Sequence, residues 1–550
     1  MDQTKTLPVA YSDGVLDTND SIGRHLKNIV AERLSRRVAM VGGLKASAMA
    51  FVGTSMLTAC LDDDDGGSAV AAPGEEISTT TGQSVLLTGG GSWAQTSGPD
   101  VELAETDDGM EFIAPAVESE TELTFEQAGA GASGKVTKVM VGPAKLTFSA
   151  VEKHLDDVVS VPAGYSLKVM TRLGDPIAAG TSAYANDGSD TDFANRIGDH
   201  GDALYYFGLG TDGKRNDGYS KRGLLTQNHE NLSEAYLHLN GPTNVASGPR
   251  PEAEALKEIE AHGVSVTEFV DSGKREWEWV QDSAFNRRIT PNTPVVFNGP
   301  VAGTDLLKTA YSPSGTTGRG TINNCANGVT GWGTLLTCEE NWAFYFRRSG
   351  DEANRSSREL TALRRYGVSS PVGNYAWSTV SPANASDTTF RRWDARAGAS
   401  GTATDDFRNE PNQFGWVLEI DPYDADSAPR KRTALGRFAH EGAWLGKLEQ
   451  GKKVAVYMGD DARREYFYKF VSDAAWQSSD GNGDGGLSFG DKYLDAGTLY
   501  VAQFDDDGTG TWKPLVHGQV PNRPATATDA EYVFADQADI LINTRLAADA

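Results

Sequence analysis

A thiol and two adjacent carboxylates lie in one short segment of this chain. Cys325 comes first, and Cys338 is followed directly by Glu339 and Glu340, with no Lys or Arg between positions 323 and 342. A thiolate is a soft metal ligand and a carboxylate is a hard one, so together they suit a transition metal beside a cation such as calcium. The simpler interpretation is a buried free cysteine followed by a solvated pair of glutamates at the end of a strand.

The two cysteines allow a further interpretation. In an oxidising compartment, Cys325 and Cys338 could form a single disulfide. That bridge would remove the thiolate from any metal site, so the disulfide and the metal ligand exclude each other, and both stay open at this point.

A second acidic pattern begins at Asp480. Asp480, Asn482 and Asp484 place oxygen atoms at positions one, three and five of a loop, and Asp491 stands at position twelve. Gly485 occupies position six, where calcium loops of the EF-hand type turn sharply. The pattern predicts a structural calcium site, and a flexible linker rich in glycine and aspartate is the alternative.

The elements that must position these residues are predicted from composition and periodicity. The chain has 550 residues with 61 Gly and 22 Pro, and few long stretches show helical periodicity. This indicates a mostly β protein with many turns, long enough for more than one domain. A net charge of −26 makes nucleic acid and anionic lipid unsuitable partners and favours divalent cations.

The largest domain is expected to cover residues 146–550 as an antiparallel β structure with long loops rich in Gly, Asp and Asn. Only residues 234–239 and 253–261 have a convincing helical pattern, and both are expected to be insertions. The expected strands cover residues 165–171, 203–209, 224–228, 294–298, 333–339, 416–420, 454–459, 467–472 and 498–504.

The N-terminal part, residues 1–60, reads as an export signal. Arg36 and Arg37 precede a mildly hydrophobic segment at positions 38–59, a pattern typical of Tat export. The segment ends in Leu-Thr-Ala-Cys, which resembles a lipoprotein cleavage box, so Cys60 is expected to be the acylated first residue of the mature protein. An uncleaved transmembrane anchor is the alternative, because the apolar length is close to what spanning needs.

A linker and a small module are expected to follow the signal. Residues 61–68 contain four successive aspartates and two glycines, which predicts a flexible acidic linker. Residues 69–145 contain short strands, such as 84–88 and 136–141, at the spacing of a β-sandwich. Trp93 begins a Trp-Ala-Gln-Thr-Ser-Gly-Pro motif that resembles bacterial Ig-like or PKD-like repeats, and its indole is expected in the core. The resemblance implies a spacer or adhesion role.

Several motifs of the main domain occur together and in one order. They resemble the PhoX family of alkaline phosphatases over most of residues 146–550. The resemblance implies a β-propeller with insertions, whose loops gather around a central channel. The motifs lie at 228–231, 323–328, 331–334, 337–342, 414–422, 436–443, 456–461, 466–472 and 494–500.

The resemblance also implies a cluster of Fe3+ and Ca2+ with one cysteine ligand. The ligands that it implies are Cys325, Glu340 or its neighbour Glu339, and Glu419, with Glu230 and Glu441 as further candidates. Successive side chains of a regular strand point to opposite faces, so only one of Glu339 and Glu340 can face the channel.

Such a cluster would clamp phosphoryl oxygens and supply an oxygen nucleophile near neutral or alkaline pH. We therefore expect an exported, monomeric phosphatase that hydrolyses phosphate monoesters and is held by a lipid anchor in the periplasm or at the cell surface. A surface β-propeller that binds calcium without catalysis is the alternative. Family members continue beyond the position of Ala550 into further propeller strands, so this domain is expected to be incomplete at its C-terminus.

The lipid anchor gives a direct prediction. Mass spectrometry of the mature protein should find an acylated Cys60 at the N-terminus, and Cys60→Ser should move the protein out of the membrane fraction because the acyl chains hold it there. Leu61 differs from the aspartate that retains lipoproteins at the inner membrane, so we expect attachment to the outer membrane or the surface. An intact apolar segment at 38–59 in the mature protein would contradict the prediction.

Overall fold

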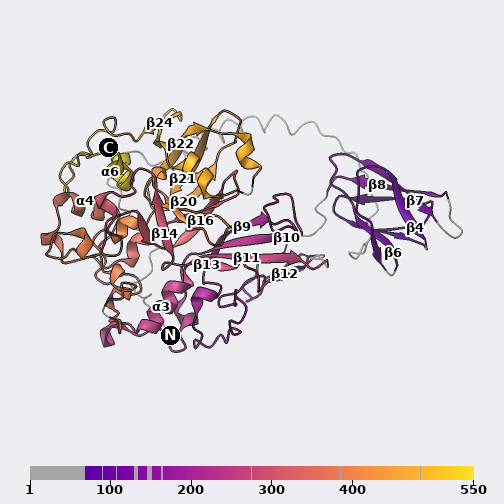
Figure 1. Cartoon of the computed structure of the whole chain (residues 1–550). Helices are drawn as coiled ribbons and strands as arrows, with labels where there is room; N and C mark the ends of the chain where they lie inside the picture. The colour runs from indigo at the N-terminus through magenta and orange to yellow at the C-terminus, as the bar shows by residue number, and fades with distance from the viewer. Residues whose placement is uncertain are drawn as a thin grey trace, which may run out of the picture. The chain divides into compact units, whose positions relative to one another are not determined.

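The computed structural model describes residues 69–550, apart from residues 90, 107, 129–133, 145–150, 163–164, 274–275, 385 and 484. Two compact units separate at Val169 and Met170 (Figure 1). The domain boundary predicted at 145/146 falls on positions outside the described residues. The predicted export signal with Arg36 and Arg37, the lipidation residue Cys60 and the acidic linker also lie outside them.

In the smaller unit, the residues that the structure describes form two four-stranded sheets. One has the strand order β1-β3-β6-β5 and the other β2-β8-β7-β4, and each includes one parallel pair. Apolar side chains of both sheets share one core, which contains Val85, Phe112, Leu123 and Val139. Trp93 is part of this core, as predicted. The strands are β1 Ala69–Ala71, β2 Glu76–Thr80, β3 Ser84–Thr88, β4 Ser92–Ser97, β5 Ala104–Thr106, β6 Gly109–Ile113, β7 Thr121–Ala128 and β8 Val136–Gly142.

The described residues of the larger unit form three sheets. The first joins β12-β11-β10-β9, with β13 also paired to β11; the second has the order β15-β14-β19-β18-β17-β16; the third has the order β20-β21-β22-β23-β24. The strands are β9 Gly201–Gly208, β10 Arg222–His229, β11 Gly263–Asp271, β12 Trp277–Trp279, β13 Arg287–Ile289, β14 Pro294–Asn298, β15 Thr317–Arg319, β16 Asn324–Val329, β17 Leu335–Glu339, β18 Val417–Ile420, β19 Arg430–Arg432, β20 His440–Leu445, β21 Lys453–Asp460, β22 Phe467–Ala475, β23 Gly497–Phe504 and β24 Gly510–Pro514.

These sheets confirm a mostly β chain. All three are open in the part of the chain that the structure describes, as the blades of a propeller also are, and the closed ring of blades stays a prediction. Eight of the nine strands expected in this domain coincide with observed strands. The exception is 165–171, where the prediction of a strand was wrong: the alternating apolar residues Tyr165, Leu167 and Val169 are exposed and no described strand pairs with them.

Helices are more numerous than the sequence pattern indicated. The two expected helices are present as α2 Glu234–Leu237 and α3 Glu252–Ala261, but the prediction that these were the only convincing ones was wrong. Ser356 and Glu359 form a capping box that starts a further helix, although its polar composition hides the periodicity. None of the helices among the described residues is long and apolar enough to cross a bilayer. The additional helices are α4 Ser357–Arg365, α5 Leu487–Leu494, α6 Gln537–Ile542 and α7 Thr544–Asp549.

The middle sheet of the larger unit is buried on both faces. Leu336, Cys338 and Val417 pack into one core with side chains of β21, β22, β23 and the C-terminal helices. Leu335 and Leu418 point the other way and pack with Phe207, Leu224 and Val264 of the first sheet. Because side chains alternate along β17 and β18, the middle sheet packs against both neighbouring sheets.

Two sheet edges come very close at Gly328 of β16. The strands β16 and β20 are end strands of their sheets and pack against each other. A Cβ atom added to Gly328 would overlap the carbonyl oxygen of Ala443 in β20. Glycine is therefore needed here for a close approach of two backbones.

Gly328→Ala should push β16 and β20 apart and lower the free energy of unfolding by about 1–3 kcal/mol, as overpacking in a tight core does. Denaturant unfolding monitored by tryptophan fluorescence measures the change. Gly218→Ala is the matched control, because Gly218 is exposed and a Cβ there meets only the side chain of Asn216 at 3.8 Å. Equal stability of the two variants would contradict the close approach.

Candidate metal centre

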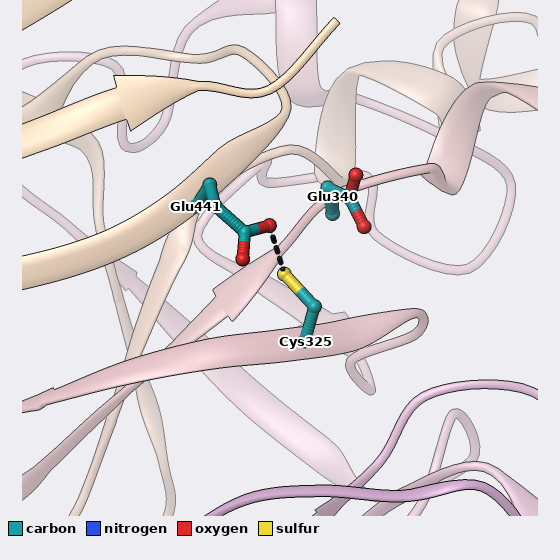
Figure 2. Close-up of side chains that lie close together, drawn as sticks. All are labelled: Cys325, Glu340 and Glu441. Atoms are coloured by element: carbon teal, nitrogen blue, oxygen red, sulfur yellow. Dashed lines mark hydrogen bonds between the residues drawn. The ribbon is translucent and has the colours of Figure 1, made fainter. Parts of the chain in front are cut away.

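Three side chains from two different sheets converge on one point. Cys325 lies in β16, Glu340 directly follows β17, and Glu441 lies in β20. One ligand atom from each of them lies within 4.8 Å of the other two (Figure 2). The structure thus brings together the cysteine and two of the carboxylates that the family resemblance pointed to.

Strand irregularities aim these side chains. The β16–β17 ladder pairs Asn324 with Glu339 but then Asn327 with Thr337, so an extra residue is inserted beside Cys325. The β20–β21 ladder shifts in the same way immediately after Glu441. A bulge bends its strand and redirects a side chain, and bulges often border functional sites. Both strands therefore lose their regular alternation where they supply a candidate ligand.

The thiol of Cys325 donates a hydrogen bond to the carboxylate of Glu441, with 2.9 Å between Sγ and Oε2 (Figure 2). Burial raises the pKa of Cys325 well above its ordinary value, and the negative charges of Glu340 and Glu441 raise it further. The thiol is therefore protonated in the metal-free protein. A cation bound here would replace the proton shared by the Cys325 thiol and the Glu441 carboxylate. Both side chains would then be anionic.

The carboxylates around the thiol repel one another. Burial, followed by the charges of Glu441 and Glu230, raises the pKa of Glu340 to about 9. Burial, followed by the charges of Asp202 and Glu441, raises the pKa of Glu230 to about 7. The charged groups that act most strongly on both residues, including Asp461, are all negative. A soft thiol beside several hard oxygen donors fits the predicted combination of a transition metal and a hard cation.

Two of these acids were absent from the predicted ligands. Asp461 follows β21 directly, as Glu340 follows β17 and Glu230 follows β10, and it ends the family motif at 456–461, which is the signal that could have found it. Asp202 lies near the start of β9 and carries no local signal.

Glu339 and Glu419 are not part of this cluster, because buried cations and donors already occupy them. Glu339 pairs with Lys431 at 2.8 Å and accepts the amide hydrogens of residues 415 and 416. Glu419 pairs with Arg432 and accepts hydrogen bonds from the Trp332 indole and a threonine hydroxyl. Both acids hold β17, β18 and β19 together, which is a structural role.

The predicted calcium loop does not fit the observed geometry. Asp480 accepts hydrogen bonds from Lys492 and Tyr493 at 2.7 and 2.6 Å. Asp491 lies inside helix α5 and pairs with Arg430 and Arg432. Basic side chains thus take the oxygens of positions one and twelve. Of the remaining predicted ligands, Asn482 is exposed and Asp484 lies outside the described residues.

The two cysteines of the described chain are both free thiols, and both are buried. Cys338 points into the hydrophobic core between the second and third sheets, whereas Cys325 points to the carboxylates. The geometry favours the metal-ligand interpretation of Cys325 over the disulfide.

A β unit whose sheet edges bring a thiol and clustered acids together has the features of a metal-dependent enzyme. Residues 146–550 match the family model of alkaline phosphatase PhoX, and the chain belongs to this family. A similar solved structure is that of Pseudomonas fluorescens PhoX in complex with vanadate, a transition state analogue. The two are 35% identical with a TM-score of 0.60, over 73% of this chain and 63% of that chain. The chain thus spans less than two thirds of this relative. No curated protein matches the chain.

The raised pKa of Glu340 predicts how stability depends on pH in chelator-treated protein. The pKa of Glu340 rises from 4.5 to about 9 on folding, so stability should fall as pH rises between these values, where the unfolded chain alone releases the proton. Glu340→Gln should flatten that fall and raise stability at the alkaline end. Unfolding followed across this pH range measures both effects.

Glu339→Gln is the matched comparison, because it makes the same change in the neighbouring residue. It leaves the charge of Lys431 buried and unpaired, so it should lower the free energy of unfolding by about 3–5 kcal/mol. The assignment of roles would be wrong if the two variants had the opposite effects.

Proposed function

We propose that this chain is an exported phosphatase that hydrolyses phosphate monoesters with a cluster of Fe3+ and Ca2+. The observation that carries the proposal is the convergence of Cys325, Glu340 and Glu441 in a member of the PhoX family. The relative with the solved structure binds vanadate, described there as a transition state analogue, which supports phosphoryl chemistry for the family site.

The donor types suggest how the residues would share the ions. Cys325 would bind the iron, because thiolates bind transition metals whereas calcium takes oxygen ligands. Glu441 and Glu340 lie close enough to bind the same ion or a neighbouring one. Glu230 and Asp461, which act electrostatically on Glu340, would supply oxygen atoms to calcium.

Charge decides what the residues can do without the ions. The acidic side chains around Cys325 offer no positive charge to the anionic phosphate of a substrate, and the whole chain carries a net charge of −26. The bound ions would supply the positive charge that holds phosphoryl oxygens and stabilises the transition state. The protein's part is to hold its acids in place so that phosphate binds only after the cations.

Export and anchoring are part of the proposal. Arg36 and Arg37 before a mildly apolar segment support Tat export, and Cys60 supports a lipid anchor in the periplasm or at the cell surface. A β-propeller with insertions is the proposed architecture of the larger domain, and a monomer is the proposed state. For the smaller unit, an Ig-like or PKD-like spacer agrees with its two sheets around one core.

The test is hydrolysis of p-nitrophenyl phosphate by chelator-treated protein after calcium and ferric iron are restored. Activity should require both ions, and Cys325→Ser should lower activity and iron content by at least about 10-fold, because replacing even a residue that only orients a metal ligand has an effect of that size. Cys338→Ser is the matched control, because Cys338 is a free buried cysteine outside the cluster. Full activity after chelation would contradict the proposal. Calcium binding without hydrolysis would favour the surface calcium-binding protein.

A further inference from the structure

Asn323 has an unusual backbone conformation directly before the Cys325 strand. Its φ is 51°, in the left-handed region that asparagine tolerates better than most residues other than glycine. The residue is buried, with 2% of its surface exposed. A left-handed residue at this point turns the chain sharply into β16, so the backbone conformation and the placement of Cys325 depend on each other.

Asn323 binds both of the other segments that carry candidate ligands. Its main-chain carbonyl accepts the amide hydrogen of Glu340 at 3.0 Å, and its side-chain Oδ1 accepts the amide hydrogen of Asn341 at 2.6 Å. Its Nδ2 donates to the carbonyl oxygen of Glu230 at 3.3 Å. One residue therefore joins the Cys325, Glu340 and Glu230 segments through hydrogen bonds.

A chain of buried side chains fixes the orientation of this amide. Burial lowers the pKa of His262 to about 3, so its imidazole is neutral. Nδ1 of His262 lies 2.7 Å from the carbonyl oxygen of Glu258 and must donate, which leaves Nε2 to accept from the Tyr345 hydroxyl at 3.1 Å. The oxygen of that hydroxyl accepts from Nδ2 of Asn323 at 3.3 Å. Every donor then faces an acceptor, and the amide has a single satisfactory orientation.

We propose that Asn323 is a positioning residue of the metal centre, which sets the spacing of the Cys325, Glu340 and Glu230 segments before the ions bind. The inference rests on the proposed metal cluster. Residues that orient metal ligands through hydrogen bonds typically change metal affinity or activity by about 10- to 100-fold when they are replaced. Asn323 touches none of the reacting atoms, so its effect would act through the ligands.

The test compares Asn323→Gly with Asn186→Gly in the whole chain. Glycine adopts the left-handed conformation freely, so Asn323→Gly keeps the backbone turn and removes only the side-chain hydrogen bonds. Asn186 is also left-handed, with φ 55°, and it is exposed, so it makes the same change away from the site. Calcium titration, iron content and the visible absorption of a thiolate bound to ferric iron are measured in chelated and reloaded protein.

Asn323→Gly should bind calcium and iron about 10- to 100-fold more weakly and lose the thiolate absorption, while Asn186→Gly matches the unchanged chain. If Asn323→Gly fails to fold, Tyr345→Phe decides, because it removes only the hydroxyl that orients the amide; a smaller loss in the same direction is expected. Normal metal affinity in a folded Asn323→Gly or in Tyr345→Phe overturns the positioning role alone. An unchanged chain that binds no metal overturns the proposed function first, and the positioning role with it.

Discussion

Acidic groups whose charges would repel one another are held close together around Cys325, and the packing of the larger unit has to oppose that repulsion. Glu340 shows the strain, since burial and neighbouring acids raise its pKa to about 9. The opposing free energy comes from a middle sheet packed on both faces. Two other buried acids are already neutralised by ion pairs: Lys431 pairs with Glu339, and Arg432 pairs with Glu419. The groups that act most strongly on Glu340, Glu230 and Glu441 include no such cation, which makes these three acids available to metal ions.

The accuracy of the centre comes from places where regular structure is interrupted. Gly328 lets β16 approach β20 until their backbones touch, and bulges then turn Cys325 and Glu441 toward each other. A regular ladder would keep side chains in strict alternation across each sheet. The left-handed turn at Asn323 places the segment of Glu340 beside these two residues. Each interruption stands within a few residues of a candidate ligand, so local strain and ligand placement are linked in this fold.

Strand positions were largely predictable because buried strands show apolar runs and alternation that depend on local sequence alone. The roles of the acids were less predictable. Nothing near Glu419 shows that its partner is Arg432, because that arginine lies on a neighbouring strand whose register depends on the whole sheet. Asp480 and Asp491 have the spacing of a calcium loop, yet their carboxylates pair with basic residues, and Asp491 lies within helix α5. Cys325 and its partners were found through the resemblance of whole motifs to a family, which contains the tertiary information that spacing lacks.

The candidate ligands come from distant parts of the chain, from Glu230 through Cys325 and Glu340 to Glu441, on strands of three different sheets. Contacts between residues so far apart in sequence form late, because the loops between them must close before any pairing can stabilise them. An unfolded or nascent chain would therefore present scattered weak donors and no centre. Under the proposed function, metal loading would follow folding, and ions that bind only the folded chain would stabilise a structure already complete.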